Sequence, residues 1–274
     1  MKGRYEEKFC RNIGIFTQEE QNKLKKTTIG IAGMGGVGGM LAERLIRIGV
    51  GKLKITDTGA FELSNFNRQV GANEETMNLK KADVLYHELK KINTEAEIIF
   101  NNEGIRSAMD ASDFVDGCDL VIDEMDYGAW KESIYLQRTA RKNGIHYLFS
   151  GAIGFGALLT NFDPTGMTLE EYNGISPEED LEKIETGSVS SDKVLPIVPS
   201  YASDAMSMEM MKEILSGERP VPTCSIGVGL ASLLAGNEAV NTLLRRKEII
   251  TAPNYLYVDL MDRKFITGSM TNNK

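Results

Sequence analysis

Cysteine and histidine are scarce in this chain of 274 residues, and neither occurs in a pattern typical of a metal site. The three cysteines, Cys10, Cys118 and Cys224, are far apart, so they form no CxxC pair and no even-numbered disulfide framework. The two histidines, His87 and His146, also lack the spacing of metal ligands. Because no disulfide framework is present, we expect a reduced, cytoplasmic setting.

Long apolar runs and an excess of positive charge are also missing. No segment approaches 18 uninterrupted apolar residues, and the stretch MKGRYEEKFCRN contains no apolar signal region. We therefore expect a protein that is neither exported nor embedded in a membrane. The formal net charge is -8, which argues against a broad surface for nucleic acid.

What the chain does contain is an alternation of strand-like and helix-like segments. Apolar runs that predict strands lie at 28–32, 52–56, 96–100, 119–123 and 146–150. Helical spacing of apolar residues follows them at 38–48, 79–92, 110–115 and 130–143. This order predicts an α/β fold with a doubly wound, mostly parallel Rossmann-like sheet. A later strand at 157–162, helices at 201–215 and 226–246, and a hairpin over 255–267 predict an antiparallel extension.

A glycine-rich turn directly follows the first predicted strand. The stretch GIAGMGGVGG holds the spacing Gly33-x-Gly35-x-x-Gly38, with Gly36 inside it. Such a turn places the N–H groups and the dipole of a helix N-terminus beside an anion. Gly33 would permit the tight turn, Gly35 the approach of a phosphate, and Gly38 the packing of the helix on the strand. These four glycines are candidate nucleotide-binding residues.

The residues beyond the second strand favour ATP over a nicotinamide cofactor. Asp57 ends that strand, and its carboxylate can accept hydrogen bonds from ribose hydroxyls in either nucleotide. The stretch DTGAFELSNFNRQVG then places Asn65 and Arg68 where phosphates would lie. Lys81 begins the next helix, and Asp126 follows the fourth strand, where a carboxylate can hold Mg²⁺ on a polyphosphate. Two cations, an amide and a carboxylate predict a triphosphate site.

Together these motifs resemble those of the ThiF/MoeB/HesA family, relatives of the adenylation domain of ubiquitin-activating enzymes. The matching stretches are GMGGVGG, ITDTGAFELSNFNRQ, NLKKAD and DLVIDEMD, and FSGAIGFGALLTNFDP fits the family's later strand pair. The resemblance covers roughly 4–165 with specific motifs and 220–260 more loosely. It implies binding of ATP with Mg²⁺ and transfer of AMP to a carboxylate, with release of pyrophosphate.

The resemblance also implies a role for each candidate. Asp57 would hold the ribose, and Asp126 would hold the metal ion. Asn65 and Arg68 would contact the phosphates, and Lys81 would neutralise charge around the α-phosphate.

An N-terminal arginine of this family reaches into the ATP site of a partner subunit. The stretch FCRN fits that motif and nominates Arg11, which implies a homodimer. The same resemblance implies one ThiF-like adenylation domain over 1–274. Within it we expect an N-terminal helical segment at 1–26, a nucleotide-binding core at 27–165, and a crossover loop with an acceptor-binding part at 166–274.

The chain departs from the family in its cysteines. Some members hold zinc with two CxxC pairs, and because this chain has none we predict no zinc site. Many members carry a reactive cysteine in the crossover loop, whereas residues 166–200 contain none, and Cys224 is interpreted as structural. Gly59 also stands where the family has a second acidic residue. These differences leave open whether the reaction stops at the acyl-adenylate.

The acceptor and two other functions stay open at this point. The carboxylate could belong to the C-terminus of a ubiquitin-like carrier protein, to a peptide or to a small biosynthetic acid. An enzyme like tRNA threonylcarbamoyl-adenosine dehydratase is a close alternative, although the acidic charge disfavours a nucleic acid substrate. An NAD(P)-dependent oxidoreductase would use the glycines and Asp57, but it has no need of Arg68, Lys81 and Asp126 together.

Overall fold

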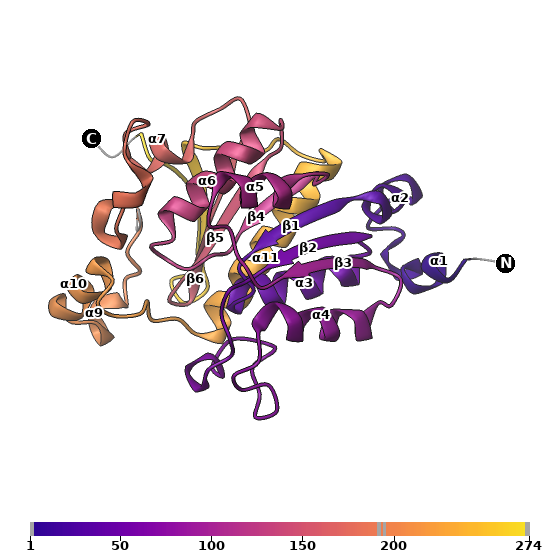
Figure 1. Cartoon of the computed structure of the whole chain (residues 1–274), viewed down its shortest axis with the longest axis horizontal. Helices are drawn as coiled ribbons and strands as arrows, with labels where there is room; N and C mark the ends of the chain where they lie inside the picture. The colour runs from indigo at the N-terminus through magenta and orange to yellow at the C-terminus, as the bar shows by residue number, and fades with distance from the viewer. Residues whose placement is uncertain (1–2, 191–192, 194–195, 272–274) are drawn as a thin grey trace.

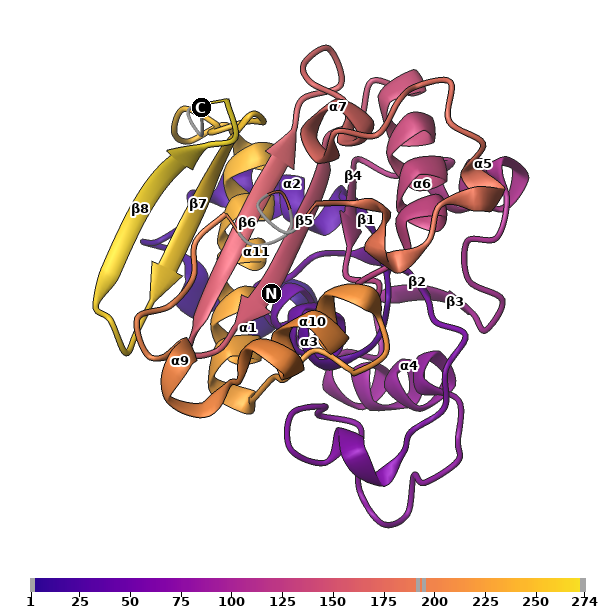
Figure 2. The ribbon, with the colours of Figure 1, turned by 90° about the vertical axis from the view of Figure 1, so that its left-hand side faces the viewer.

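The computed structural model describes residues 3–190, 193 and 196–271. Eight strands of this part form one sheet in the order β3-β2-β1-β4-β5-β6-β7-β8 (Figures 1 and 2). Their bounds are β1 Thr28–Ala32, β2 Lys52–Thr56, β3 Glu97–Asn101, β4 Leu120–Asp123, β5 Tyr147–Ile153, β6 Gly156–Phe162, β7 Asn254–Asp259 and β8 Lys264–Ser269. The first five strands pair in parallel, and the last three are antiparallel to their neighbours. The predicted fold class, including the antiparallel extension, is confirmed.

Helices cover both faces of the parallel strands (Figure 1). One layer holds α3 Gly36–Ile48, α4 Lys81–Ile92 and the long α11 Ser225–Leu244. The other layer holds α5 Ala108–Val115 and α6 Trp130–Lys142. Each layer closes a separate apolar core against the sheet.

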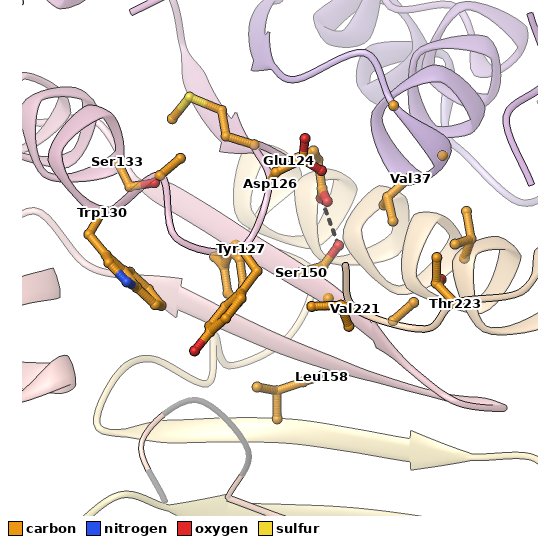
Figure 3. Close-up of a pocket in the computed structure, with 18 of the residues that line it drawn as sticks. Val37, Glu124, Asp126, Tyr127, Trp130, Ser133, Ser150, Leu158, Val221 and Thr223 are labelled. Carbon is orange, nitrogen blue, oxygen red and sulfur yellow. Dashed lines mark hydrogen bonds between the residues drawn. The ribbon is translucent and has the colours of Figure 1, made fainter. Parts of the chain in front are cut away.

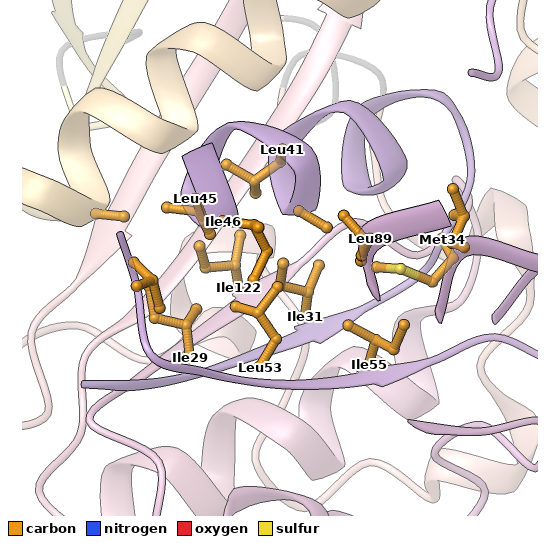
Figure 4. Close-up of a cluster of buried hydrophobic side chains, with 14 of the residues drawn as sticks. Ile29, Ile31, Met34, Leu41, Leu45, Ile46, Leu53, Ile55, Leu89 and Ile122 are labelled. Atoms are coloured by element: carbon orange, nitrogen blue, oxygen red, sulfur yellow. The ribbon is translucent and has the colours of Figure 1, made fainter. Parts of the chain in front are cut away.

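The core under α3 shows why these segments fold as they do (Figure 4). Ile29, Ile31 and Leu53 project from the sheet toward Leu41 and Leu45 of α3, and all five side chains are fully buried. Burying each such side chain contributes about 1.5–3 kcal/mol. β1 is buried along its whole length because both faces of a parallel sheet are covered.

The N-terminal segment packs on the end of α3 that is farther from the glycine turn. It contains α1 Arg4–Lys8, the 3₁₀ turn η1 Cys10–Asn12 and α2 Gln18–Lys26, which begins with the predicted capping box of Thr17 and Glu20. Asn12 Nδ2 donates to the carbonyl of Ile48, the last residue of α3, at 3.1 Å. Because α3 rises about 1.5 Å per residue, η1 lies roughly 20 Å from the start of that helix.

Among the described residues, the elements between β6 and α11 are short. They are α7 Leu169–Asn173, the 3₁₀ turns η3 Leu181–Lys183 and η4 Thr186–Ser188, α9 Ala202–Ala205 and α10 Met208–Ser216. The prediction of one helix over 201–215 is wrong, because Met206 is extended and Ser207 Oγ caps a new helix by accepting from the N–H of Met210. Figure 1 shows α9 and α10 at the end of the molecule opposite α1.

None of the helices within the described ranges combines the length and the apolar character that a membrane span requires.

Candidate functional site

Two neighbouring cavities open where the parallel strands end. Their volumes are about 380 Å³ and about 300 Å³. Gly35, Glu124, Met125, Asp126 and Ala129 line both cavities and so form a shared wall. This wall follows β1 and β4, the point where the strand order reverses, and open α/β sheets bind their ligands at such a point.

The glycine turn is built around close backbone contacts. Gly33 has a φ of +95°, and a Cβ there would lie 2.2 Å from the carbonyl oxygen of Glu124. A Cβ at Gly38 would lie 1.9 Å from the carbonyl oxygen of Gly33. The turn itself therefore requires glycine at this position, rather than the packing of α3 on β1. A Cβ at Gly36 would lie 2.9 Å from Val228 of α11. Only Gly35 has open space, and it faces both cavities.

Asp57 and Lys81 lie together in the smaller cavity. Asp57 Oδ2 accepts from the N–H of Met34 at 2.6 Å, which ties the end of β2 to the glycine turn. Its Oδ1 accepts from the N–H of Gly59 at 2.7 Å. A Cβ at Gly59 would come within 3.0 Å of Asp57 Oδ1 and 3.3 Å of Lys81 Nζ, so a side chain at this position would crowd both charged groups.

Arg106, which the sequence did not indicate, also lines the smaller cavity. Its Nη1 lies 3.0 Å from Glu103 Oε2. Arg106 comes a few residues after β3. Its position at the carboxyl end of a third parallel strand is the signal that could have identified it.

Arg68 lines the larger cavity, whereas Asn65 lines neither. Arg68 Nη1 donates to the carbonyl of Ser64 at 3.1 Å, so the guanidinium is held on its own loop. Asn65 is buried, and its Oδ1 accepts from the N–H of Glu62 at 3.2 Å. Asn65 therefore builds the 3₁₀ turn η2 Leu63–Asn65, which precedes Arg68.

The acidic residues after β4 differ sharply in environment. Asp126 is exposed and faces both cavities. Glu124, which sequence reasoning missed, accepts a hydrogen bond from Ser150 Oγ at 2.6 Å (Figure 3). Burial raises the pKa of Glu124 well above its usual range, and the nearby Asp123 raises it further. The shared wall thus combines a carboxyl with a raised pKa, that of Glu124, with the exposed side chain of Asp126.

Aromatic side chains form much of the larger cavity. Those that line it are Tyr127, Trp130, Tyr147, Phe149, Phe162 and Tyr172. Trp130 Nε1 donates to the carbonyl of Thr186 in η4 at 3.0 Å, and the hydroxyl of Tyr127 donates to the carbonyl of Leu215 in α10 at 3.3 Å. These bonds hold the segment between β6 and α11 against the cavity.

Arg11 lies in neither cavity. It is exposed on η1, at the far end of α3, so it cannot reach the site of its own chain. The structure thus brings together the glycines, Asp57, Lys81, Arg68 and Asp126, and it leaves Asn65 and Arg11 apart from them.

Comparisons with known proteins agree with this architecture. The chain is 27% identical over 252 residues to the tRNA threonylcarbamoyladenosine dehydratase of Bacillus subtilis, covering 88% of this chain and 96% of that protein. It is 26% identical over 200 residues to a probable molybdopterin-synthase adenylyltransferase of Porphyra purpurea, covering 72% of this chain and 50% of that protein. The crystal structure of Escherichia coli MccB with ATP has the same fold, with a TM-score of 0.72 at 18% identity over 98% of this chain and 74% of that one.

A sequence model of the ThiF family matches residues 9–274. Since this match spans nearly the whole chain, the chain belongs to the ThiF family.

Proposed function

We propose that this chain is an ATP-dependent adenylyltransferase that activates a carboxylate as an acyl-adenylate and releases pyrophosphate. One observation carries the proposal: Asp57 and Lys81 share one cavity, Arg68 lines the next, and Asp126 stands in the wall between them. The family supports ATP as the nucleotide. We also propose the division into a helical segment at 1–26, a nucleotide-binding core at 27–165 and an acceptor-binding part at 166–274.

The smaller cavity would receive the nucleoside. Both oxygens of Asp57 already accept backbone N–H groups, yet a carboxylate has further lone pairs for ribose hydroxyls. The phosphates would extend along Gly35 toward the N-terminus of α3, where the helix dipole favours anions.

Asp126 suits Mg²⁺, because its exposed carboxylate supplies the hard oxygen ligand that this ion prefers. Among the described residues there is no group of three or more His, Cys, Asp or Glu side chains that could hold a metal. That fits an ion bound by one carboxylate and by phosphate oxygens. Mg²⁺ bound there would offset negative charge on the polyphosphate. The absence of zinc stays a prediction.

In the chemical step, an oxygen of the acid forms a bond to the α-phosphorus while the bond from that phosphorus to the bridging oxygen breaks. Pyrophosphate leaves with the electron pair of the broken bond. The acid is already ionised at neutral pH, so the barrier lies mainly in bringing two anions together. Arg68 and Lys81 would offset that repulsion, and the loss of either would slow the reaction by roughly a hundredfold.

We propose a homodimer in which Arg11 completes the site of the other subunit. Arg246, just beyond α11, donates to the carbonyl of Ile15 at 2.6 Å, so the N-terminal segment lies at the C-terminal end of α11. The other end of α11 borders the larger cavity at Val228. The outer face of this helix carries Leu233, which is 54% exposed. Packing α11 antiparallel on its copy would bring each Arg11 toward the partner's site.

Two experiments test the proposal. Calorimetric titration should give binding of ATP with Mg²⁺ and none of NAD, and binding of NAD alone would overturn it. Mixing equal amounts of Arg11→Ala and Asp126→Ala proteins should restore about a quarter of the wild-type activity, because half of the random dimers would hold one intact site of two. The absence of any rescue would contradict the role of Arg11 across the dimer.

A dehydratase acting on threonylcarbamoyl-adenosine in tRNA is the second candidate. It is favoured by the similarity to the Bacillus subtilis protein over most of both chains. The net charge of -8 argues against it. Incubation with ATP and tRNA carrying that modification would distinguish the two, because the dehydratase would lower the mass of the modified nucleoside by that of one water, with the carboxylate oxygen leaving in AMP.

A further inference from the structure

Arg246, the second residue after α11, binds the N-terminal segment through both its charge and its flat face. Its Nε and Nη2 donate to the two carboxylate oxygens of Glu20 at 2.7 Å and 2.6 Å, and Nη2 also donates to the carbonyl of Ile15 at 2.6 Å. The guanidinium carbon lies 4.8 Å from the centre of the Phe16 ring. A guanidinium that binds both oxygens of one carboxylate is held in a fixed direction. The Arg246 guanidinium also lowers the pKa of Glu20 to about 2, so this carboxylate is ionised at neutral pH.

The loop that Arg246 binds folds back on η1. The N–H groups of Ile15 and Phe16 donate to the carbonyl of Asn12 at 3.0 Å and 2.9 Å. Asn12 is the last residue of η1 and directly follows Arg11. Arg11 is exposed, and its side chain has no partner among the described residues. The direction of Arg11 therefore depends on the backbone of η1, and a shift of the loop would move that backbone.

Two helices anchor η1, and both begin at the candidate site. Asn12 Nδ2 donates to the carbonyl of Ile48 at the end of α3, and Arg246 holds the loop at the end of α11. At the other end of these helices, a Cβ at Gly36 of α3 would lie 2.9 Å from Val228 of α11, and both residues line the larger cavity. One anchor fixes the place of η1, and the second anchor also fixes its orientation.

We propose that Arg246 is a positioning residue for Arg11, and that it acts on the site of the partner subunit rather than on the site of its own chain. The inference rests on the proposed function, which places Arg11 across a homodimer. Arg11 lies at the far end of α3 from its own site, so an effect that passes through it appears in the partner. Because the loop is held before the nucleotide binds, Arg11 loses less freedom when it contacts a phosphate.

The affinity for a non-hydrolysable ATP analogue with Mg²⁺ tests the link between the two arginines. Arg246→Ala should weaken binding by about tenfold, because a displaced Arg11 loses its contact with the phosphates. The double variant should bind no more weakly than Arg11→Ala alone, since Arg246 acts only through Arg11. Arg246→Lys should lose less, because an ammonium group keeps the charge but not the fork that binds Glu20 and Ile15 together.

Mixed dimers show in which subunit Arg246 acts. Gly35→Ala weakens the site of its own chain and leaves the N-terminal segment unchanged. In a random equal mixture of Arg246→Ala and Gly35→Ala proteins, half of the dimers are mixed, and each of these holds one site with an intact glycine turn and a correctly held Arg11. A quarter of all sites should therefore bind the analogue with wild-type affinity. If Arg246→Ala instead damaged its own site through α11, no site in the mixture would do so.

Arg141 offers the matched control. It lies in the last turn of α6, outside both cavities, and its Nη1 donates to the carbonyl of Gly166 in a loop at 2.7 Å. It therefore resembles Arg246 in binding a loop carbonyl from the end of a helix. Arg141→Ala should leave the affinity for the analogue unchanged.

Four results would overturn the inference. They are wild-type affinity in Arg246→Ala, weaker binding in the double variant than in Arg11→Ala, no sites of wild-type affinity in the mixture, and an equal loss in Arg141→Ala. Failure of the proposed function looks different. It would appear as no binding of the analogue to the wild-type protein, or as wild-type affinity in Arg11→Ala, and either result would remove the inference as well.

Discussion

Replacement of Gly33 by alanine should lower the stability of the fold, whereas replacement of Gly35 by alanine should lower the affinity for ATP. Gly33→Ala puts a Cβ at a φ of +95° and 2.2 Å from the backbone of Glu124. The left-handed conformation alone costs about 1–2 kcal/mol, and moving a backbone segment adds to it. We expect a loss of about 3 kcal/mol, which for a chain of this size lowers the melting temperature by roughly 6–12 °C.

Gly35→Ala should leave stability almost unchanged, because among the described residues, its chain neighbours aside, the only atom within 4 Å of the new Cβ is Gln69 Nε2 at 3.9 Å. The new methyl group would instead fill the space shared by the two cavities and keep phosphates away from the backbone. ATP affinity should fall by about tenfold to a hundredfold, or about 1.4–2.7 kcal/mol. Calorimetric unfolding and ATP titration of both variants measure the two effects. A Gly35→Ala protein that binds ATP normally, or a Gly33→Ala protein as stable as the wild type, would refute the reasoning.

Substitutions at three further positions probe the stability of the fold. Glu124 has a raised pKa when folded, so its stabilising contribution is complete below its unfolded pKa of about 4.3 and is lost as the pH rises toward the folded value. Glu124→Gln should therefore gain melting temperature relative to the wild type between pH 4.5 and pH 8, and a constant difference would contradict this. Thr17→Ala removes the capping box of α2 and should cost about 1 kcal/mol in denaturant unfolding, whereas Thr17→Ser should cost little. Leu41→Ala should lower the free energy of unfolding by about 2–5 kcal/mol in the same assay. A loss below 1 kcal/mol would contradict this, because it would mean that the core under α3 closes over the space that the leucine side chain leaves.

The sequence allowed a close prediction of the parallel strands. The predicted strands at 28–32 and 52–56 match β1 and β2 residue for residue. The apolar residues of these strands are buried, and Gly33, Gly51 and Asp57 mark three of their four boundaries, so local pattern and tertiary burial agree. The helix at 201–215 failed because the methionines share a helical spacing, yet Met208 is 77% exposed and Ser207 offers a competing cap.

The candidate site was predictable only where a motif fixes the backbone. Gly33 and Asp57 occupy the expected strand ends, because the turn after a parallel strand has few possible conformations. The phosphate contact of Asn65 was implied by the family resemblance and stays a prediction, and in the structure its Oδ1 accepts a hydrogen bond from the N–H of Glu62 at the start of η2. Glu124 gave no signal, since the hydrogen bond that it accepts from Ser150 joins residues 26 positions apart in the chain.

The most direct test of the account is exchange of labelled pyrophosphate into ATP. The reaction proposed here is reversible up to the acyl-adenylate, so label should enter ATP only when a suitable acid is present, and Arg68→Ala and Lys81→Ala should each slow the exchange by roughly a hundredfold. Exchange that does not depend on any acid, or protein that binds ATP but shows no exchange with carrier-protein C-termini, peptides or small acids, would contradict the central claim.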